Sequence, residues 1–202
     1  MGRITAFDYP PGPHVRRHGP FGYTDYKSYR DWLRDDFCFR CVFCLRRERW
    51  VRRRATFHID HLVPRSEAPE RACDYTNLVY VCASCNSVKS DLAVPDPCQV
   101  GFGQCVRVHD DGRIEPLSET GELLVDLLRL DDKDCTRYRK MILDTLRLIV
   151  RNKERDAHLQ WMGYPEELPD LSRKTPPGNS RPDGIKRSCF ARKLQGKLPE
   201  SY

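Results

Sequence analysis

The stretch CASCNSVK, residues 82–89, brings two cysteines, an asparagine and a lysine together in one short segment. Cys82 and Cys85 have the Cys-x-x-Cys spacing, which places two sulfurs on one tight turn. Upstream, CVFC repeats that spacing at Cys41 and Cys44. Two such pairs match a closed tetrahedral structural Zn²⁺ site, in which the ion clamps two turns together. The sequence therefore predicts that these two turns lie side by side around one zinc ion.

One alternative ligand stays open, because Cys38, Cys41 and Cys44 form overlapping pairs with the same spacing. Cys38 could replace Cys44 in the set of four. We prefer Cys41 with Cys44, since Phe37 and Cys38 still fit the apolar pattern of the expected preceding helix. The chain has ten cysteines. Because its start lacks the apolar core of a secretion signal, metal ligands are favoured over a disulfide framework.

The two cysteine pairs bracket FHIDHLVPRS, residues 57–66, in which Asp60 and His61 lie near the end of an expected strand. The carboxylate of Asp60 and the amide oxygen of Asn86 make an oxygen-only pair suited to magnesium, with water and phosphate oxygens completing the shell. His61 points to the other side of the strand end, where it can take the proton of an attacking water. His58 shares the face of Asp60, so a contact with metal or phosphate stands beside the simpler interpretation of a hydrogen-bonded strand residue.

Taken together, CVFC, DHLVP, NL and CASCNSVK resemble the HNH family of endonucleases. The resemblance covers residues 38–91, about a quarter of the chain. It implies a small ββα-metal nuclease core stapled by a four-cysteine structural zinc. Together with the flanking helices, the β-hairpin and the basic C-terminal tail that the rest of the sequence indicates, this predicts an α+β protein. Phosphodiester hydrolysis in nucleic acid is the activity that it implies.

The same resemblance assigns roles to individual residues. It implies that Asp60 and Asn86 hold a catalytic Mg²⁺ or Mn²⁺ and that His61 is the general base. Asn77 would position the loop and orient His61 through hydrogen bonds. Lys89 matches a basic position of the family and would contact phosphate. Many members carry His where this chain has Asn86, and the Asp/Asn pair disfavours a softer metal.

Positive charge is concentrated in two segments of a chain whose formal net charge is +6. One lies within residues 45–54 and the other within residues 172–197. Such clusters indicate a polyanionic partner, most plausibly nucleic acid, although a solvated charged surface is the alternative. We expect the first segment to line the backbone of a duplex through Arg46, Arg47, Arg49, Arg52, Arg53 and Arg54.

Composition shifts divide the chain into four segments. We expect an irregular N-terminal arm over residues 1–23 and the nuclease domain with its preceding helix over 24–95. A hairpin and two amphipathic helices, the second spanning about 135–161, occupy 96–164. Residues 165–202 form a Pro-rich basic tail, disordered in isolation unless the body of the protein or a partner holds it.

The favoured function is a metal-dependent endonuclease acting on DNA, with RNA as the alternative substrate. A non-catalytic zinc-knuckle module that binds nucleic acid is the rival hypothesis. A third hypothesis makes the nuclease an effector arm whose residues 100–202 dock on an ATPase or sensor subunit, in phage (antiviral) defence or mobile-element biology. We expect a cytoplasmic protein without membrane contact, because no run of about 18 apolar residues occurs.

Overall fold

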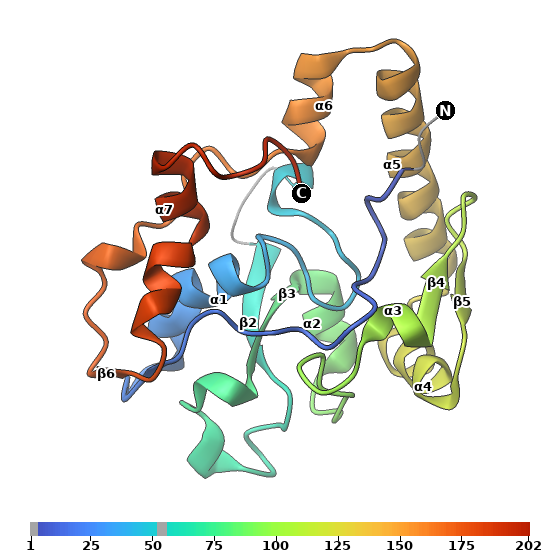
Figure 1. Ribbon diagram of the computed structural model, residues 1–202. Coiled ribbons are helices and arrows are strands. Elements are labelled where there is room, and N and C mark those ends of the chain that lie inside the picture. Colours follow the sequence, from blue (N-terminus) through green and yellow to red (C-terminus); the bar gives the residue numbers. More distant parts are fainter. Residues whose placement is uncertain (1–3, 52–55) are drawn as a thin grey trace.

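The computed structural model describes residues 4–51 and 56–202 (Figure 1). Within this part of the chain, short helices surround three two-stranded antiparallel sheets. The α+β class is therefore confirmed. No helix in the described ranges combines the length and apolar character needed to cross a bilayer.

The central unit consists of a hairpin and the helix that follows it. Strands β2 (Phe57–His61) and β3 (Leu78–Cys82) pair in antiparallel register, with Asp60 opposite Val79. All five residues of β3 are buried, whereas β2 alternates between buried and half-buried positions. Helix α2 (Ala83–Lys89) begins directly after β3, so the strand end and the helix start form one continuous turn. The predicted order of strand, loop, strand and helix is confirmed.

Two helical elements cover the other side of this unit. A 3-10 turn at Tyr26–Tyr29 leads into α1 (Arg30–Asp36), which contacts β3. Trp32 and Leu33 of α1 are fully buried in the main core. The loop between β2 and β3 carries two further 3-10 turns, Pro69–Arg71 and Tyr75–Asn77, and a third, Glu48–Trp50, follows the first cysteine pair.

The C-terminal half begins with α3 (Phe102–Cys105) and the predicted hairpin, formed by β4 (Val106–Val108) and β5 (Ile114–Pro116). Gly112 in the turn has a φ of 84°, which favours glycine. Helix α4 (Glu119–Leu128) then packs against β5 and α2. Its N-cap Ser118 accepts a hydrogen bond from the backbone N–H of Gly121, at 3.2 Å.

The long helix expected over 135–161 is two helices in the structure. Helix α5 (Lys133–Arg151) ends at Asn152, and α6 (Arg155–Met162) starts after a turn in which Lys153 has a φ of 57°. A left-handed residue cannot continue an α-helix, so the chain reverses there and α6 packs back beside α5. Similarly, α2 ends at Lys89 because Ser90 has a φ of 46°, before Pro95 is reached.

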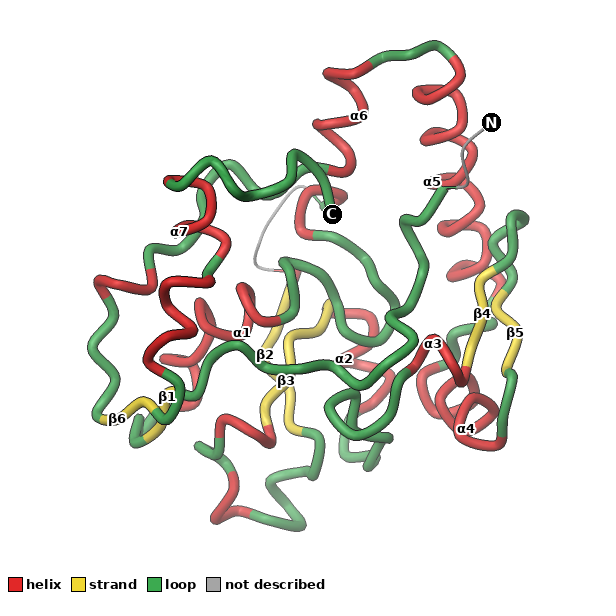
Figure 2. Tube along the Cα trace, in the orientation of Figure 1, coloured by secondary structure: helices red, strands yellow, loops and turns green. Residues whose placement is uncertain are grey.

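The N-terminal arm and the C-terminal tail lie together. Strand β1 (Pro20–Phe21) pairs with β6 (Gly178–Asn179), and Figure 2 shows the arm crossing the molecule as a loop before it reaches β1. The tail adds 3-10 turns at Leu171–Arg173 and Pro182–Arg187 and helix α7 (Cys189–Leu194). The body of the protein therefore holds the tail, as one of the sequence-based alternatives requires.

Candidate active site and metal centre

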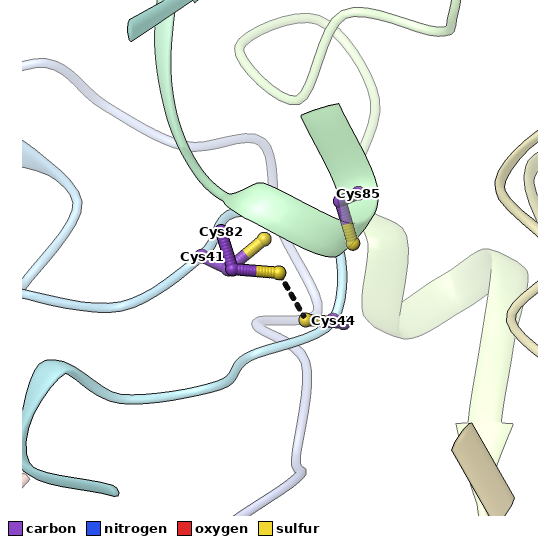
Figure 3. Close-up of side chains that lie close together, drawn as sticks. All are labelled: Cys41, Cys44, Cys82 and Cys85. Atoms are coloured by element: carbon purple, nitrogen blue, oxygen red, sulfur yellow. Dashed lines mark hydrogen bonds between the residues drawn. The ribbon is translucent and has the colours of Figure 1, made fainter. Parts of the chain in front are cut away.

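Four cysteine sulfurs converge where the two predicted turns meet (Figure 3). Cys41 and Cys44 come from the turn after α1, Cys82 ends β3, and Cys85 lies in the first turn of α2. The four Sγ atoms all lie within 4.8 Å of one another, and those of Cys44 and Cys82 are 3.6 Å apart. This clustering is the arrangement that a tetrahedral zinc site needs.

The chemistry of this cluster fits Zn²⁺. Cys41 is fully buried, and burial raises the pKa of its thiol well above the ordinary value. Buried thiolates are unfavourable without a cation, whereas coordination to Zn²⁺ stabilises them. Cys38 stands outside the cluster: its backbone φ is 52°, and its Sγ lies 4.0 Å from the carbonyl oxygen of Asp36. The structure thus brings together the preferred set, with Cys44 rather than Cys38.

The residues expected to carry the chemistry line one open cavity of about 710 Å³ beside β2 and α2. Asp60 and Asn86 are both half-buried, and both line it. His58 lines the same cavity, because it shares the β2 face of Asp60. Asp60 and Asn86 thus line a common space, and both side chains carry oxygen atoms, which a hard divalent ion prefers as ligands.

A hydrogen bond to its ring holds His61 in one orientation. Its Nε2 lies 3.0 Å from the carbonyl oxygen of Ala72, and a carbonyl only accepts, so Nε2 carries the proton. The lone pair is therefore on Nδ1, the atom that can accept a proton. Burial lowers the pKa of His61 below its usual value, which favours the neutral, basic form near pH 7.

Asn77 organises the loop that holds His61. It is fully buried, and its side chain exchanges hydrogen bonds with the backbone of Val63: Val63 N–H donates to Oδ1 at 2.9 Å, and Nδ2 donates to the carbonyl at 3.0 Å. Nδ2 also lies 3.4 Å from the carbonyl of Arg71, next to Ala72. Asn77 thereby fixes both ends of the loop, and its effect on His61 passes through Ala72.

Lys89 lies inside the protein, against Asp60. Its side chain is fully buried, and Nζ lies 3.6 Å from Oδ2 of Asp60. The Asp60 Oδ1 accepts the backbone N–H of His61 at 2.8 Å. Burial raises the pKa of the Asp60 carboxyl, and the Lys89 ammonium opposes that rise. The Lys89 ammonium is thus buried against Asp60 at the wall of the cavity, and its contact with a phosphate stays a prediction.

With this geometry in place, the comparison with known families is informative. Residues 41–92 match the family model of the HNH endonuclease. The match starts at the first cysteine of the cluster and ends after α2, so it covers both metal-binding elements and about a quarter of the chain. No curated protein matches the chain. The HNH match confirms the resemblance and supports a protein of nuclease type that acts on nucleic acid.

Two residues of the HNH site were missed by sequence reasoning. The Tyr26 ring meets the His61 ring edge-on, with centroids 5.1 Å apart, and the exposed Arg65 guanidinium lies 5.6 Å from the Tyr26 ring centroid. Tyr26 lies at helical spacing from Tyr29 and Leu33, a pattern that indicates a residue facing the core. Its contact with His61 was therefore not predicted. Arg65 follows Pro64 in FHIDHLVPRS, residues 57–66, and this position next to the motif was the available signal.

Two of the arginines expected to line a duplex, Arg47 and Arg49, make contacts within the protein. Arg47 is 1% exposed: its Nη1 donates to the carbonyl of Met162 at 3.1 Å, and its guanidinium lies 4.1 Å from the Tyr202 ring centroid. Arg49 donates to the carbonyls of Gln160 and Tyr164, at 2.8 and 2.7 Å. Arg47 is therefore too buried to contact a duplex, which corrects that expectation. Arg49 is hydrogen-bonded to the C-terminal part of the chain.

Arg46 lies beside the cysteine cluster. Its Nη1 is 3.3 Å from Ser84 Oγ, and its guanidinium lies 4.3 Å from the ring centroid of Tyr138 in α5. Because it is only half-buried, a phosphate contact stays a prediction. Arg52, Arg53 and Arg54 lie outside the described residues.

Proposed function

We propose that the protein is a metal-dependent endonuclease that hydrolyses phosphodiester bonds in nucleic acid, with DNA as the substrate. The observation that carries this proposal is the placement of Asp60, His61 and Asn86 around one open cavity beside a four-cysteine cluster. The HNH match over the same residues supports it.

The chain's own residues can divide the reaction between them. His61, with its proton on Nε2, accepts at Nδ1 the proton of a water that attacks the phosphorus. Asp60 and Asn86 would hold Mg²⁺ or Mn²⁺, which supplies charge stabilisation for the phosphate and the leaving oxygen. Asn77 and Tyr26 keep the His61 ring in place from two sides.

The structural centre has a separate task. The four cysteines tie the start of α2 to the turn after α1, and α2 carries Asn86 one residue past Cys85. A Zn²⁺ ion in this cluster would fix the position of Asn86 relative to Asp60. The proposed catalytic ion and the proposed zinc ion thus occupy different donor sets, one of oxygen and one of sulfur.

The test is cleavage of supercoiled plasmid by the purified full chain, with Mg²⁺, with Mn²⁺ and with chelator. We expect divalent-dependent nicking or linearisation that His61→Ala abolishes, while zinc content and folding stay intact. His109→Ala is the matched control, because His109 is exposed and lies in the β4–β5 hairpin, paired with Glu115. Metal-dependent nicking retained by His61→Ala would refute the assigned base.

The same assay separates the rival hypothesis of a non-catalytic binding module. That module would shift the plasmid in a gel without cutting it under any metal condition. An RNA substrate of matched length, run in parallel, tests the choice of DNA. Activation by an ATPase or sensor subunit through residues 100–202 stays a prediction, as does a role in phage defence or mobile-element biology. If the isolated chain is inactive, activation by such a subunit becomes the favoured hypothesis.

A further inference from the structure

Lys89 places a buried positive charge at the carboxylate that we propose as a metal ligand. Its side chain is 1% exposed and that of Asp60 is 12% exposed, with 3.6 Å between Nζ and Oδ2. Within the described part of the chain, neither of these two atoms has a hydrogen-bond partner. Both atoms are buried, so an ammonium and a carboxylate oxygen face each other in a low-dielectric environment without a further hydrogen bond.

The arrangement on α2 explains why this contact forms. Lys89 lies three residues after Asn86, so both side chains project from one side of the helix toward β2. Asn86, Lys89 and Asp60 all line the same cavity. A divalent ion between Asp60 and Asn86 would therefore lie close to the Lys89 ammonium.

The charges around the cavity do not favour a cation. The acidic, basic and histidine side chains lining it are two carboxylates, two cations and two histidines: Asp60, Asp91, Lys89, Arg65, His58 and His61. With the histidines neutral, the two carboxylates and the two cations cancel in formal charge. Sites for Mg²⁺ in enzymes commonly combine one or two carboxylates with substrate phosphates, because the protein donors alone bind the ion weakly.

We propose that Lys89 couples metal binding to nucleic-acid binding. In the free protein its ammonium offsets Asp60, so that a divalent ion binds weakly. A substrate phosphate adds the missing negative charge, and the ion then binds tightly beside Asp60 and Asn86. By reciprocity, the ion strengthens nucleic-acid binding by the same factor. This inference rests on the proposed function, since it concerns the same oxygen donors.

The functional consequence is that the site binds a divalent ion only weakly when no nucleic acid is bound. Like charges in a partly buried site repel more strongly than in water, because the local dielectric constant is lower. The repulsion between Lys89 and the ion is present in the free protein and is offset only by the bound phosphate. The metal centre would therefore assemble on the nucleic acid.

The experiment measures Mn²⁺ binding by electron paramagnetic resonance. It uses the full chain carrying His61→Ala, so that a DNA duplex is bound but not cut. We expect Mn²⁺ affinity to rise about tenfold or more when the duplex is added, a typical size for coupling between two sites. Asp60→Asn in the same background corrects for Mn²⁺ bound by the DNA itself.

The decisive variant is Lys89→Met, which keeps the length and burial of the side chain and removes its charge. We expect Mn²⁺ affinity in the absence of DNA to rise about tenfold and the gain on adding DNA to shrink by the same factor. Lys153→Met is the control for net charge, because Lys153 is exposed in the turn between α5 and α6. An unchanged or weaker affinity in Lys89→Met would overturn the proposal.

Two outcomes keep this inference separate from the proposed function. If Mn²⁺ binding with DNA is insensitive to Asp60→Asn, the proposed metal site fails and this inference fails with it. If binding depends on Asp60 but is equally tight with and without DNA, only the coupling is wrong. Should Lys89→Met fail to fold, equal Mn²⁺ affinity with and without DNA in the protein that keeps Lys89 would still overturn the proposal.

Discussion

Asn77 organises the loop on which the orientation of His61 depends. It is fully buried in a loop, and its side-chain amide both donates to and accepts from the backbone on the far side of that loop. A buried amide with these partners stabilises one loop conformation and excludes others. Its role is therefore to position His61, through Ala72, without touching the reacting atoms.

Asn77→Ala should destabilise the fold by about 2–4 kcal/mol, because it removes these hydrogen bonds and leaves buried backbone groups unpaired. Nuclease activity should fall further than stability explains, since His61 loses its fixed orientation. Urea unfolding and plasmid cleavage on the same preparation measure both effects. Thr76→Ala is the matched control, because the exposed Thr76 hydroxyl bonds to nearby Asp74. Full activity in Asn77→Ala would contradict the positioning role.

His14 illustrates a residue whose protonation affects stability. Its ring stacks on Phe37 with centroids 4.5 Å apart, and its Nε2 is buried without a partner in the described structure. Burial lowers the pKa of His14 to about 3, assisted by the nearby guanidinium groups of Arg16, Arg17 and Arg40. The folded protein therefore holds this imidazole in its neutral form.

Since His14 takes up a proton near pH 6.5 when unfolded and near pH 3 when folded, stability is lost as the pH falls through that window. The contribution of one such proton is about 1.4 kcal/mol per pH unit. We expect His14→Gln to make the free energy of unfolding less dependent on pH by about this slope between about pH 6 and 4. Urea unfolding at several pH values measures it, with His109→Gln as the exposed control. Equal slopes in His14→Gln and the unmodified protein would rule out this account.

At the scale of elements, the decisive junction is the one between β3 and α2. Cys82 ends the strand and Cys85 lies in the first turn of the helix, so the cluster joins them to the turn after α1. Helix α2 has only seven residues and is too short to be stable alone. Its position relative to β2 therefore depends on the cysteine cluster and on packing against α4.

Cys85→Ser should lose bound zinc and unfold α2, because metal binding and folding are coupled in such sites. The measurements are zinc content by mass spectrometry of the metal and helix content by circular dichroism. Cys38→Ser is the informative control: it has the same chemistry in the neighbouring turn but lies outside the cluster, so it should keep one zinc per chain. Zinc loss in Cys38→Ser with retention in a Cys44→Ser variant would reverse the assignment.

At the scale of the whole molecule, both chain ends are anchored to the central part of the protein by buried polar contacts. The His18 Nε2 lies 2.8 Å from Oδ2 of Asp35, whose Oδ1 accepts the backbone N–H of Cys189 at 2.8 Å. On the other side, Arg47 binds the carbonyl of Met162 and the ring of Tyr202. The arm, the core and the tail thus form one connected structure.

Arg47→Met should destabilise the protein by about 2–4 kcal/mol, because the carbonyl of Met162 loses its buried donor and Tyr202 loses its cation. Arg46→Met, in the half-buried neighbour, should cost less than half as much. Thermal unfolding of the two variants gives the comparison. If Arg47→Met weakened DNA binding while leaving stability unchanged, the original expectation of a duplex contact would be restored.

Much of the site was predictable because its signals are local. The spacing of Cys41, Cys44, Cys82 and Cys85 determines a tetrahedral sulfur site, and the alternation along β2 separates Asp60 from His61. The roles of the arginines were not predictable, because six of them in one short segment carry the same charge pattern whether they face solvent or the C-terminal helices. Arg47 is buried only because residues more than a hundred positions away return to cover it.

The sequence by itself determined the α+β class, the four-cysteine cluster and the order of strand, loop, strand and helix, whereas the pairing of Asp60 with Asn86 stays a prediction. These follow from short-range spacing and periodicity, which act within a strand, a turn or a helix. Only the tertiary structure decided that Lys89 faces Asp60, that Tyr26 supports His61 and that the basic tail is held against α1. Each of these depends on burial, and burial is set by which distant segments pack together rather than by the residues on either side.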